Sequence, residues 1–215
     1  QRQMCIRDRL TPEQILTSEK NALDWNLNQL GSTGDHSFIY TNANYALLAG
    51  IIRKVTKKPF AAALDQTILA PLKLTHTRNF DALSAKMPVA QGYLSEDDQS
   101  YQPDDLSQAL LSSLLGSGSV YMSVTDLAKV IIAAETGKII PKKVYHQLIA
   151  AHYADSNQYA SGVAWLDDQR LLQGMYNDNP ESFSTLAYFR ANATSGVVLF
   201  GNHTMTTDTV TLAQN

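Results

Sequence analysis

A phenol and a carboxamide stand two positions apart in Tyr40-Thr41-Asn42, where a polar loop opens directly into an apolar helix. A tyrosine side chain has a pKa of about 10 in water. Tyr40 therefore needs a neighbouring cation to act as a base near neutral pH. Asn42 also suits the helix that we expect to begin at Ala43, because asparagine is a favoured N-cap residue. A triplet of this kind also arises by chance, so its meaning depends on what surrounds it.

Other side chains that could act as nucleophiles or metal ligands have simpler interpretations. Ser117 and Ser119 lie in a glycine-rich stretch, but no Gly-x-Ser-x-Gly pattern and no preceding strand mark a nucleophile elbow, so we expect a loop. His146 and His152 are six residues apart, which is the wrong spacing for a helical metal pair. We expect no metal site and no cofactor. The histidines are spread along the chain at His36, His76, His146, His152 and His203.

Composition excludes several classes of protein. The chain has 215 residues, 44% of them hydrophobic, and a net charge of −3, which is ordinary for a globular domain. Cys5 is the single cysteine, so no internal disulfide can form. Basic residues are scattered, and one helix carries the two pairs Arg53-Lys54 and Lys57-Lys58, which we interpret as a solvated helix face, not a nucleic-acid interface. No apolar run approaches the ~18 residues of a membrane span.

Apolar periodicity predicts the helices that position the triplet. Leu47, Leu48, Ile51, Ile52 and Val55 recur at helical spacing, and Pro59 ends that helix. Ser123 caps another, closed by Gly137. The remaining expected helices run over residues 11–17, 60–70 (stopped by Pro71), 106–115 and 141–149.

The pattern changes to that of strands near Gly162. Four short strands are expected, joined by short links, with Asp167-Asp168 as a hairpin turn between the first two. Short links imply antiparallel pairing. Helices followed by an antiparallel sheet form an α+β fold. The expected strands cover residues 162–165, 171–175, 183–189 and 197–200, and residues 81–103 are expected to form a polar, irregular excursion.

Residues 38–52 and 68–77 together resemble the serine β-lactamase and penicillin-binding-protein (DD-peptidase) family. In that family a Tyr-Ser-Asn motif opens a helix, and a Pro-Leu-Gly-Met-x-x-Thr turn follows, which Pro71-Leu72-Lys73-Leu74 resembles. Residues 116–127 add a resemblance to Gly-Gly-Leu-x-Ser-Thr-x-x-Asp-Leu. The resemblance covers about residues 10–202. It implies the fold of that family and an acyl-enzyme reaction at a serine.

The resemblance implies roles for particular residues. Tyr40 matches the tyrosine that carries a proton to the leaving group, and Asn42 matches the asparagine that orients substrate and lysine. The third motif of the family, Lys-Thr-Gly or His-x-Gly, lies on a strand that binds the substrate carboxylate. Gln173, Gly174 and Met175 stand in its place, with no positive charge at Gln173 and no glycine at Met175.

The nucleophile motif of the family, Ser-x-x-Lys, does not occur in this sequence. Thr17-Ser18-Glu19-Lys20 is the nearest pattern. It is rejected because residues 16–23 stand where the family has Leu-Leu-Thr-His-Thr-Ser-Gly-Leu, a segment that follows the nucleophile. We expect the serine and lysine upstream of residue 1, and expect this chain alone to be inactive.

We therefore expect a partial β-lactamase-like domain over residues 10–215, helical over about 10–160 and with strands over about 161–202. Residues 1–9 are expected to be a non-native or disordered leader, and the sheet is expected to expose an edge, favouring marginal stability or association. The expected function is that of an envelope serine hydrolase acting on an ester or amide, with a small-molecule or cell-wall-derived substrate, no nucleic acid, and a membrane link only through an upstream anchor. Two alternatives remain: a non-catalytic relative that binds a cell-wall or peptide ligand in the same cleft, and a chance resemblance in an unrelated α+β domain.

Overall fold

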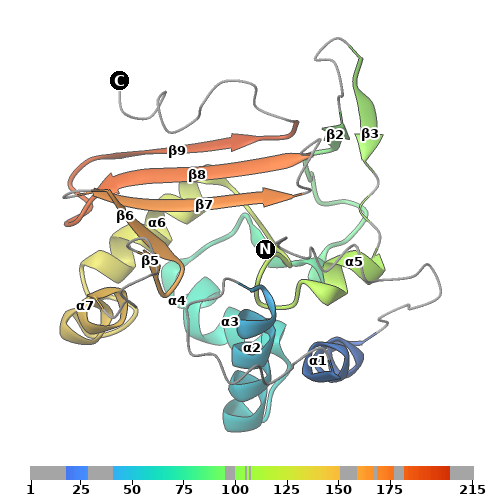
Figure 1. Ribbon diagram of the computed structural model, residues 1–215, viewed down its shortest axis with the longest axis horizontal. Coiled ribbons are helices and arrows are strands. Elements are labelled where there is room, and N and C mark those ends of the chain that lie inside the picture. The colour runs from blue at the N-terminus through green and yellow to red at the C-terminus, as the bar shows by residue number, and fades with distance from the viewer. Residues whose placement is uncertain are drawn as a thin grey trace. The chain divides into compact units, whose positions relative to one another are not determined.

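The computed structural model describes residues 18–28, 41–94, 100–104, 106, 108–150, 159–166, 169–176 and 182–203. The chain divides into two compact units. The first comprises Gln1–Pro88 and Leu106–Met122, and the second comprises Val89–Asp105 and Ser123–Asn215. Figure 1 shows the elements of both in chain order.

Helices dominate the first unit. The expected helix after Asn42 is present as α2, and α1 was not predicted from the sequence. A small antiparallel pair, β1 with β4, accompanies them, with Thr77 opposite Met122. The described elements of this unit are α1 (Glu19–Asn28), α2 (Ala43–Thr56), α3 (Phe60–Leu64), a π-helical segment (Asp65–Leu69), α4 (Ala70–Leu72), β1 (Thr77–Asn79), a 3₁₀ turn (Phe80–Ala82), α5 (Gln108–Ser113) and β4 (Val120–Met122).

Pro71 does not stop the helix at Ala70, as the sequence predicted. It lies inside α4, and the helical run continues to Leu72. Proline has no backbone N–H and would interrupt an ordinary α-helical ladder. The π-helical turns of Asp65–Leu69 come directly before it and provide the altered hydrogen-bond spacing that this requires. The turn closes with the Leu74 N–H donating to the Leu69 carbonyl at 2.8 Å.

Small residues let α1 and α2 pack closely in the first unit. Ala22 and Ala49 are buried together with Leu115, and the partly buried Leu23 and Phe60 pack against them. Burial of such apolar surface is the main source of stability in a helical unit of this kind. The packed side of α2 is therefore its alanine side, which also includes Ala43 and Ala46.

The second unit contains the expected antiparallel sheet, in the order β5-β6-β7-β8-β9. Figure 1 shows β7, β8 and β9 side by side. Each strand pairs with its neighbour in sequence, and Leu166 lies opposite Gln169 at the β6–β7 hairpin. The described elements are β2 (Gly92–Leu94), β3 (Gln102–Asp104), α6 (Val124–Glu135), α7 (Lys142–Ala150), β5 (Tyr159–Ala160), β6 (Val163–Leu166), β7 (Gln169–Tyr176), β8 (Phe183–Arg190) and β9 (Gly196–Gly201).

Helix α6 covers the core of this sheet. Ile131 of α6 is buried with Ala187 and Phe189 of β8, and Leu172 and Val198 pack against them. The predicted cap is present, because the Ser123 Oγ accepts a hydrogen bond from the Asp126 N–H at 3.2 Å. Gly137 has φ +80°, which only glycine adopts without strain, and so ends the helix as predicted.

Two expectations about local structure were wrong. The polar stretch 81–103 is not wholly irregular, because β2 pairs with β3 and the Tyr93 N–H donates to the Asn202 carbonyl at 2.8 Å. The helix expected over residues 106–115 is shorter, as α5 ends at Ser113. The helix expected over residues 11–17, the leader 1–9 and the turn Asp167-Asp168 lie outside the described residues.

Candidate functional site

Asn42 stands at the first turn of α2, and Tyr40 lies outside the described residues. The prediction that the Asn42 side chain caps α2 was wrong. Asn42 has helical backbone angles (φ −62°, ψ −26°) and makes no side-chain capping bond. The Thr41 Oγ1 accepts from the Ala43 N–H at 3.3 Å instead. The Asn42 carboxamide is therefore not committed to the helix end, which leaves its donor and acceptor available for a ligand.

Backbone contacts fix the start of α2 in place. The Asn42 carbonyl accepts from the N–H groups of Tyr45 and Ala46 at 3.0 and 3.3 Å. Gly116 packs against this turn: it has φ +77°, and a Cβ there would lie 2.6 Å from the Tyr45 carbonyl oxygen. Only glycine fits this position, and the loop around Gly116 thereby supports the turn that presents Asn42.

The two serines of this loop have structural roles. Ser119 is buried, and its hydroxyl donates to the Asn79 Oδ1 at 2.9 Å, which joins the loop to β1. The Ser117 hydroxyl donates to the Leu114 carbonyl at 3.1 Å. Both hydroxyls are used inside the fold, in agreement with the loop interpretation made from the sequence.

Gln173, Gly174 and Met175 lie together on β7, opposite Leu186, Thr185 and Ser184 of β8. Gln173 and Gly174 are exposed, and for Met175 only the backbone is described. A Cβ at Gly174 would approach only the Thr185 Cβ, at 3.9 Å, so crowding does not require glycine here. The exposed neutral amide of Gln173 brings no positive charge to this strand.

A buried polar cluster, which the sequence did not reveal, lies behind β7 in the second unit. Arg170 is only 4% exposed, and its guanidinium carbon lies 3.5 Å from the centre of the Trp165 ring. On α6, Glu135 is 1% exposed, and its Oε1 accepts from the Tyr145 hydroxyl of α7 at 3.1 Å. The stack of an arginine on an aromatic face is a favourable cation–π contact.

Burial is the main cause that raises the Tyr145 pKa far above its ordinary value, and the Glu135 carboxylate raises it further; the Arg170 guanidinium acts in the opposite direction. Tyr145 is thus held as a neutral donor to Glu135. Among the described residues, the Glu135 Oε2, Trp165 Nε1 and Arg170 Nε are buried without a hydrogen-bond partner. An arginine that shares the core-facing side of β7 with Leu172 is the one signal in the sequence that could have indicated this cluster.

Asn42 belongs to the first unit, and Gln173, Gly174 and Met175 belong to the second.

In the part of the chain that the structure describes, no group of three or more histidine, cysteine or acidic side chains could hold a metal ion. That same part has no helix of the length and apolarity needed to cross a membrane.

Comparison with known proteins gives a family match over most of the chain. The family model described as "Beta-lactamase" matches residues 26–212. Penicillin-binding protein PbpX of Bacillus subtilis (strain 168) is 28% identical over 167 residues, which is 76% of this chain and 39% of PbpX. Teichoic acid D-alanine hydrolase of Staphylococcus aureus is 32% identical over 124 residues, covering 56% of this chain and 29% of that protein.

The fold also matches a solved structure. The crystal structure of FmtA from Staphylococcus aureus superposes with a TM-score of 0.69 at 24% identity, covering 86% of this chain and 49% of the FmtA chain. The chain therefore spans less than half the length of each of these three proteins. The expected fold type is confirmed.

Proposed function

The chain belongs to the beta-lactamase family. We propose that it is part of an envelope serine hydrolase that cleaves an ester or amide through an acyl-enzyme. The observation that carries the proposal is the Tyr40-Thr41-Asn42 block, which opens α2 inside the matched region. The related teichoic acid D-alanine hydrolase supports a D-alanyl ester as the substrate.

In this proposal Tyr40 transfers a proton to the leaving group, and Asn42 orients the substrate and the lysine of the nucleophile motif. The position of Asn42 supports its role. Its carboxamide is not used to cap α2, so both of its polar atoms can bind other partners. The turn that presents it is held by Gly116 and by the first hydrogen bonds of the helix.

Gln173, Gly174 and Met175 form the substrate-binding segment of β7 in this proposal. The exposed Gln173 carries no charge, so it gives a substrate carboxylate no ion pair. An ester whose recognised part lacks a free carboxylate suits this strand better than a classical penicillin or a peptide C-terminus. The family relation and this strand together favour esterase over carboxypeptidase chemistry.

No Ser-x-x-Lys occurs among the 215 residues. Without the motif serine there is no acyl acceptor, and without the motif lysine Tyr40 lacks the cation that would stabilise its phenolate in the proposed reaction. We therefore propose that the nucleophile is supplied by coding sequence upstream, and that this chain does not turn over substrate unaided.

The test begins with the source DNA. We expect an in-frame Ser-x-x-Lys some tens of codons before Leu16. The longer protein should then be labelled covalently by a fluorophosphonate and should hydrolyse a D-alanyl ester. Tyr40→Phe should lower its rate by about 10²-fold or more, as expected for loss of a general acid–base group. An intact gene with another residue in place of that serine would refute the hydrolase.

Two observations favour a second candidate. The uncharged Gln173 and the absent nucleophile both suit a non-catalytic relative that binds a cell-wall or peptide ligand in the same cleft. Such a protein would bind a D-alanyl ligand without covalent labelling. The fluorophosphonate experiment separates the two candidates, because only the enzyme forms a covalent adduct.

A further inference from the structure

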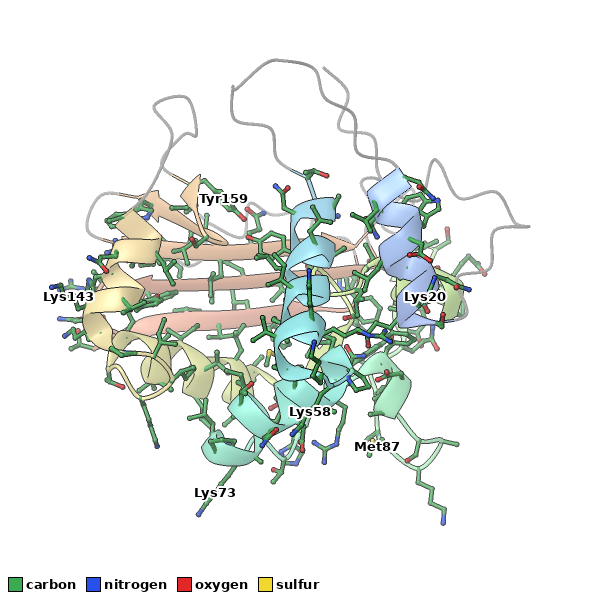
Figure 2. The ribbon with its side chains drawn as sticks, turned by 90° about the horizontal axis from the view of Figure 1, so that it is seen from below. Lys20, Lys58, Lys73, Met87, Lys143 and Tyr159 are labelled. Atoms are coloured by element: carbon green, nitrogen blue, oxygen red, sulfur yellow. The ribbon has the colours of Figure 1, made fainter. Side chains whose placement is uncertain are left out.

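The C-terminal half of α2 presents a strongly basic face. Gly50, Arg53, Lys54 and Lys57 line a surface depression of about 360 Å³. Their spacing of three, four and seven residues places them on one side of the helix. Lys58 follows, and Figure 2 labels it beside this end of α2. The concentration of cations contrasts with the net charge of −3 of the whole chain.

Little of this charge is neutralised inside the fold. The Arg53 Nη1 lies 3.4 Å from the Glu19 Oε1, and that carboxylate also accepts from the Phe60 N–H at 3.0 Å. Lys58 donates to the amide oxygen of Gln66, which carries no charge. Within the described residues, no acidic side chain lies at ion-pair distance from Lys54 or Lys57. The face therefore keeps a net positive charge.

Helix stability alone does not account for this arrangement. One or two cations in the last turn are favourable to the helix dipole, and Arg53 and Lys54 satisfy that need. Lys57 adds a like charge four residues after Arg53, which is unfavourable in an isolated helix. It also has φ 58°, in the left-handed region, where glycine or asparagine would cost less. Lys73 has the same left-handed conformation (φ 54°) at the end of α4, so it is the charge of Lys57 beside Arg53 and Lys54, and not its backbone conformation, that points to a ligand.

The cations of the depression suit a phosphate anion. Gly50 is the point where α2 packs against α1, because a Cβ there would lie 3.1 Å from the Leu23 Cδ2. The three cationic side chains beside this contact can donate charge-assisted hydrogen bonds to the oxygens of a phosphate group. Arg53 lies eleven residues beyond Asn42, or about 17 Å along the helix axis. One phosphate group cannot span that length, whereas a polymer can.

We propose that this basic face of α2 (Arg53, Lys54 and Lys57 around Gly50) binds the phosphate backbone of an anionic, polyol-phosphate polymer. This inference rests on the proposed function, since the polymer is one that carries the ester that the hydrolase cleaves. The face holds the backbone while an ester elsewhere on the same polymer reaches the catalytic residues. It therefore adds affinity for the polymer and none for a small ester.

Binding to the 215-residue chain tests this without any need for turnover. The probe is poly(glycerol phosphate) of defined length, titrated by calorimetry at 50 and 200 mM salt. We expect Lys54→Gln with Lys57→Gln to weaken binding at least tenfold and to flatten the salt dependence, since fewer counterions are released. Lys54→Arg with Lys57→Arg should retain the affinity.

A matched control removes the same charge elsewhere. Lys142 and Lys143 are both exposed at the start of α7, and Lys142→Gln with Lys143→Gln should leave the affinity within twofold. Equal weakening by both pairs would overturn the proposal, as would failure of the polymer to bind at all. Equal binding of a DNA duplex or of phosphatidylglycerol vesicles with the same number of phosphates would also overturn it.

The outcomes also separate this site from the proposed reaction. If the chain binds the polymer through Lys54 and Lys57 but the longer protein neither takes the fluorophosphonate label nor cleaves esters, the hydrolase fails and the binding face remains. If the longer protein hydrolyses small esters but the chain does not bind the polymer, the proposed binding face is refuted and the proposed hydrolase activity is not.

Discussion

At the scale of single residues, the best-defined chemistry in the second unit is the hydrogen bond between Tyr145 and Glu135. Both side chains come from helices, and the Arg170 guanidinium on β7 acts to lower the pKa of the Tyr145 phenol. A buried carboxylate is costly unless it is hydrogen-bonded or paired. Tyr145 supplies the hydrogen bond, and Arg170 supplies a nearby charge.

Replacing Tyr145 by phenylalanine removes this donor. The Glu135 Oε2 already lacks a partner among the described residues, so Tyr145→Phe would leave neither carboxylate oxygen with one there. We expect the free energy of unfolding to fall by about 1–3 kcal/mol, measured by urea denaturation at pH 7. Tyr101→Phe, at an exposed tyrosine, should change it by less than about 0.5 kcal/mol.

Alkaline pH should weaken the same contact. The Tyr145 pKa is raised in the folded state by burial and by Glu135, whereas the unfolded chain titrates near about 10. Above that pH the unfolded state releases the proton and the folded state retains it. Stability should therefore be complete below about pH 10 and should fall as pH rises further. Urea denaturation from pH 8 to 11.5 checks this, and a slope that Tyr145→Phe leaves unchanged would contradict it.

The sequence indicated some residues of the candidate site better than others. Asn42 was found because local order, a polar loop followed by an apolar helix, is visible in a single chain. Its capping role was predicted wrongly because Asn42 already has helical backbone angles and its side chain makes no capping bond, while the Thr41 Oγ1 accepts from the Ala43 N–H. Glu135, Tyr145 and Arg170 escaped notice because their meeting depends on how α6, α7 and β7 pack, which no local pattern records.

At the scale of elements, the loop before β4 and the strand β7 use glycine differently. Gly116 has φ +77°, and a Cβ there would clash with the Tyr45 carbonyl oxygen at 2.6 Å. At Gly174 a Cβ would meet only the Thr185 Cβ, at 3.9 Å. We expect Gly116→Ala to lower the free energy of unfolding by at least about 1–3 kcal/mol, and Gly174→Ala to change it by less than about 1 kcal/mol. Thermal unfolding of the two variants checks this, and equal losses would contradict it.

Elements with strong periodicity were predicted well. The helix α2, the capped helix α6 and the strands β6 to β9 all lie close to their expected positions. The helix α1 (Glu19–Asn28) was missed because its sequence has only a weak apolar stripe, and because its first residues were compared with a family motif and not examined for helical spacing. The short pairs β1–β4 and β2–β3 join residues far apart in the chain, and such pairing is decided by tertiary contact.

At the scale of the whole molecule, α2 has an apolar side that stays exposed among the described residues. Leu48, Ile51, Ile52 and Val55 are 51, 56, 37 and 76% exposed, on the side opposite its buried alanines. Exposed apolar residues in a continuous stripe favour association. The association expected from the sequence stays a prediction, and this helix face is a second surface that could cause it, beside the sheet edge that was predicted.

A variant tests the role of this stripe. Ile51→Lys with Val55→Lys should reduce concentration-dependent association of the chain, measured by analytical ultracentrifugation between about 5 and 100 μM, because two charges must then be desolvated on contact. Ile132→Lys is the control, at a similarly exposed position of α6. An equal effect of the control would mean that association does not use α2.

The order of the strands in the sheet affects how the chain folds while it is being synthesised. Each of β5 to β9 pairs with the strand made just before or after it, so these pairings need only short loop closures and can form quickly. Gln91 is different, because its carbonyl accepts from the Asn202 side chain, 111 residues later. At about 5–20 residues per second, residues around β2 wait roughly 5 to 20 s for Asn202 to be made, so this contact forms only after all the strands from β5 to β9 have been synthesised.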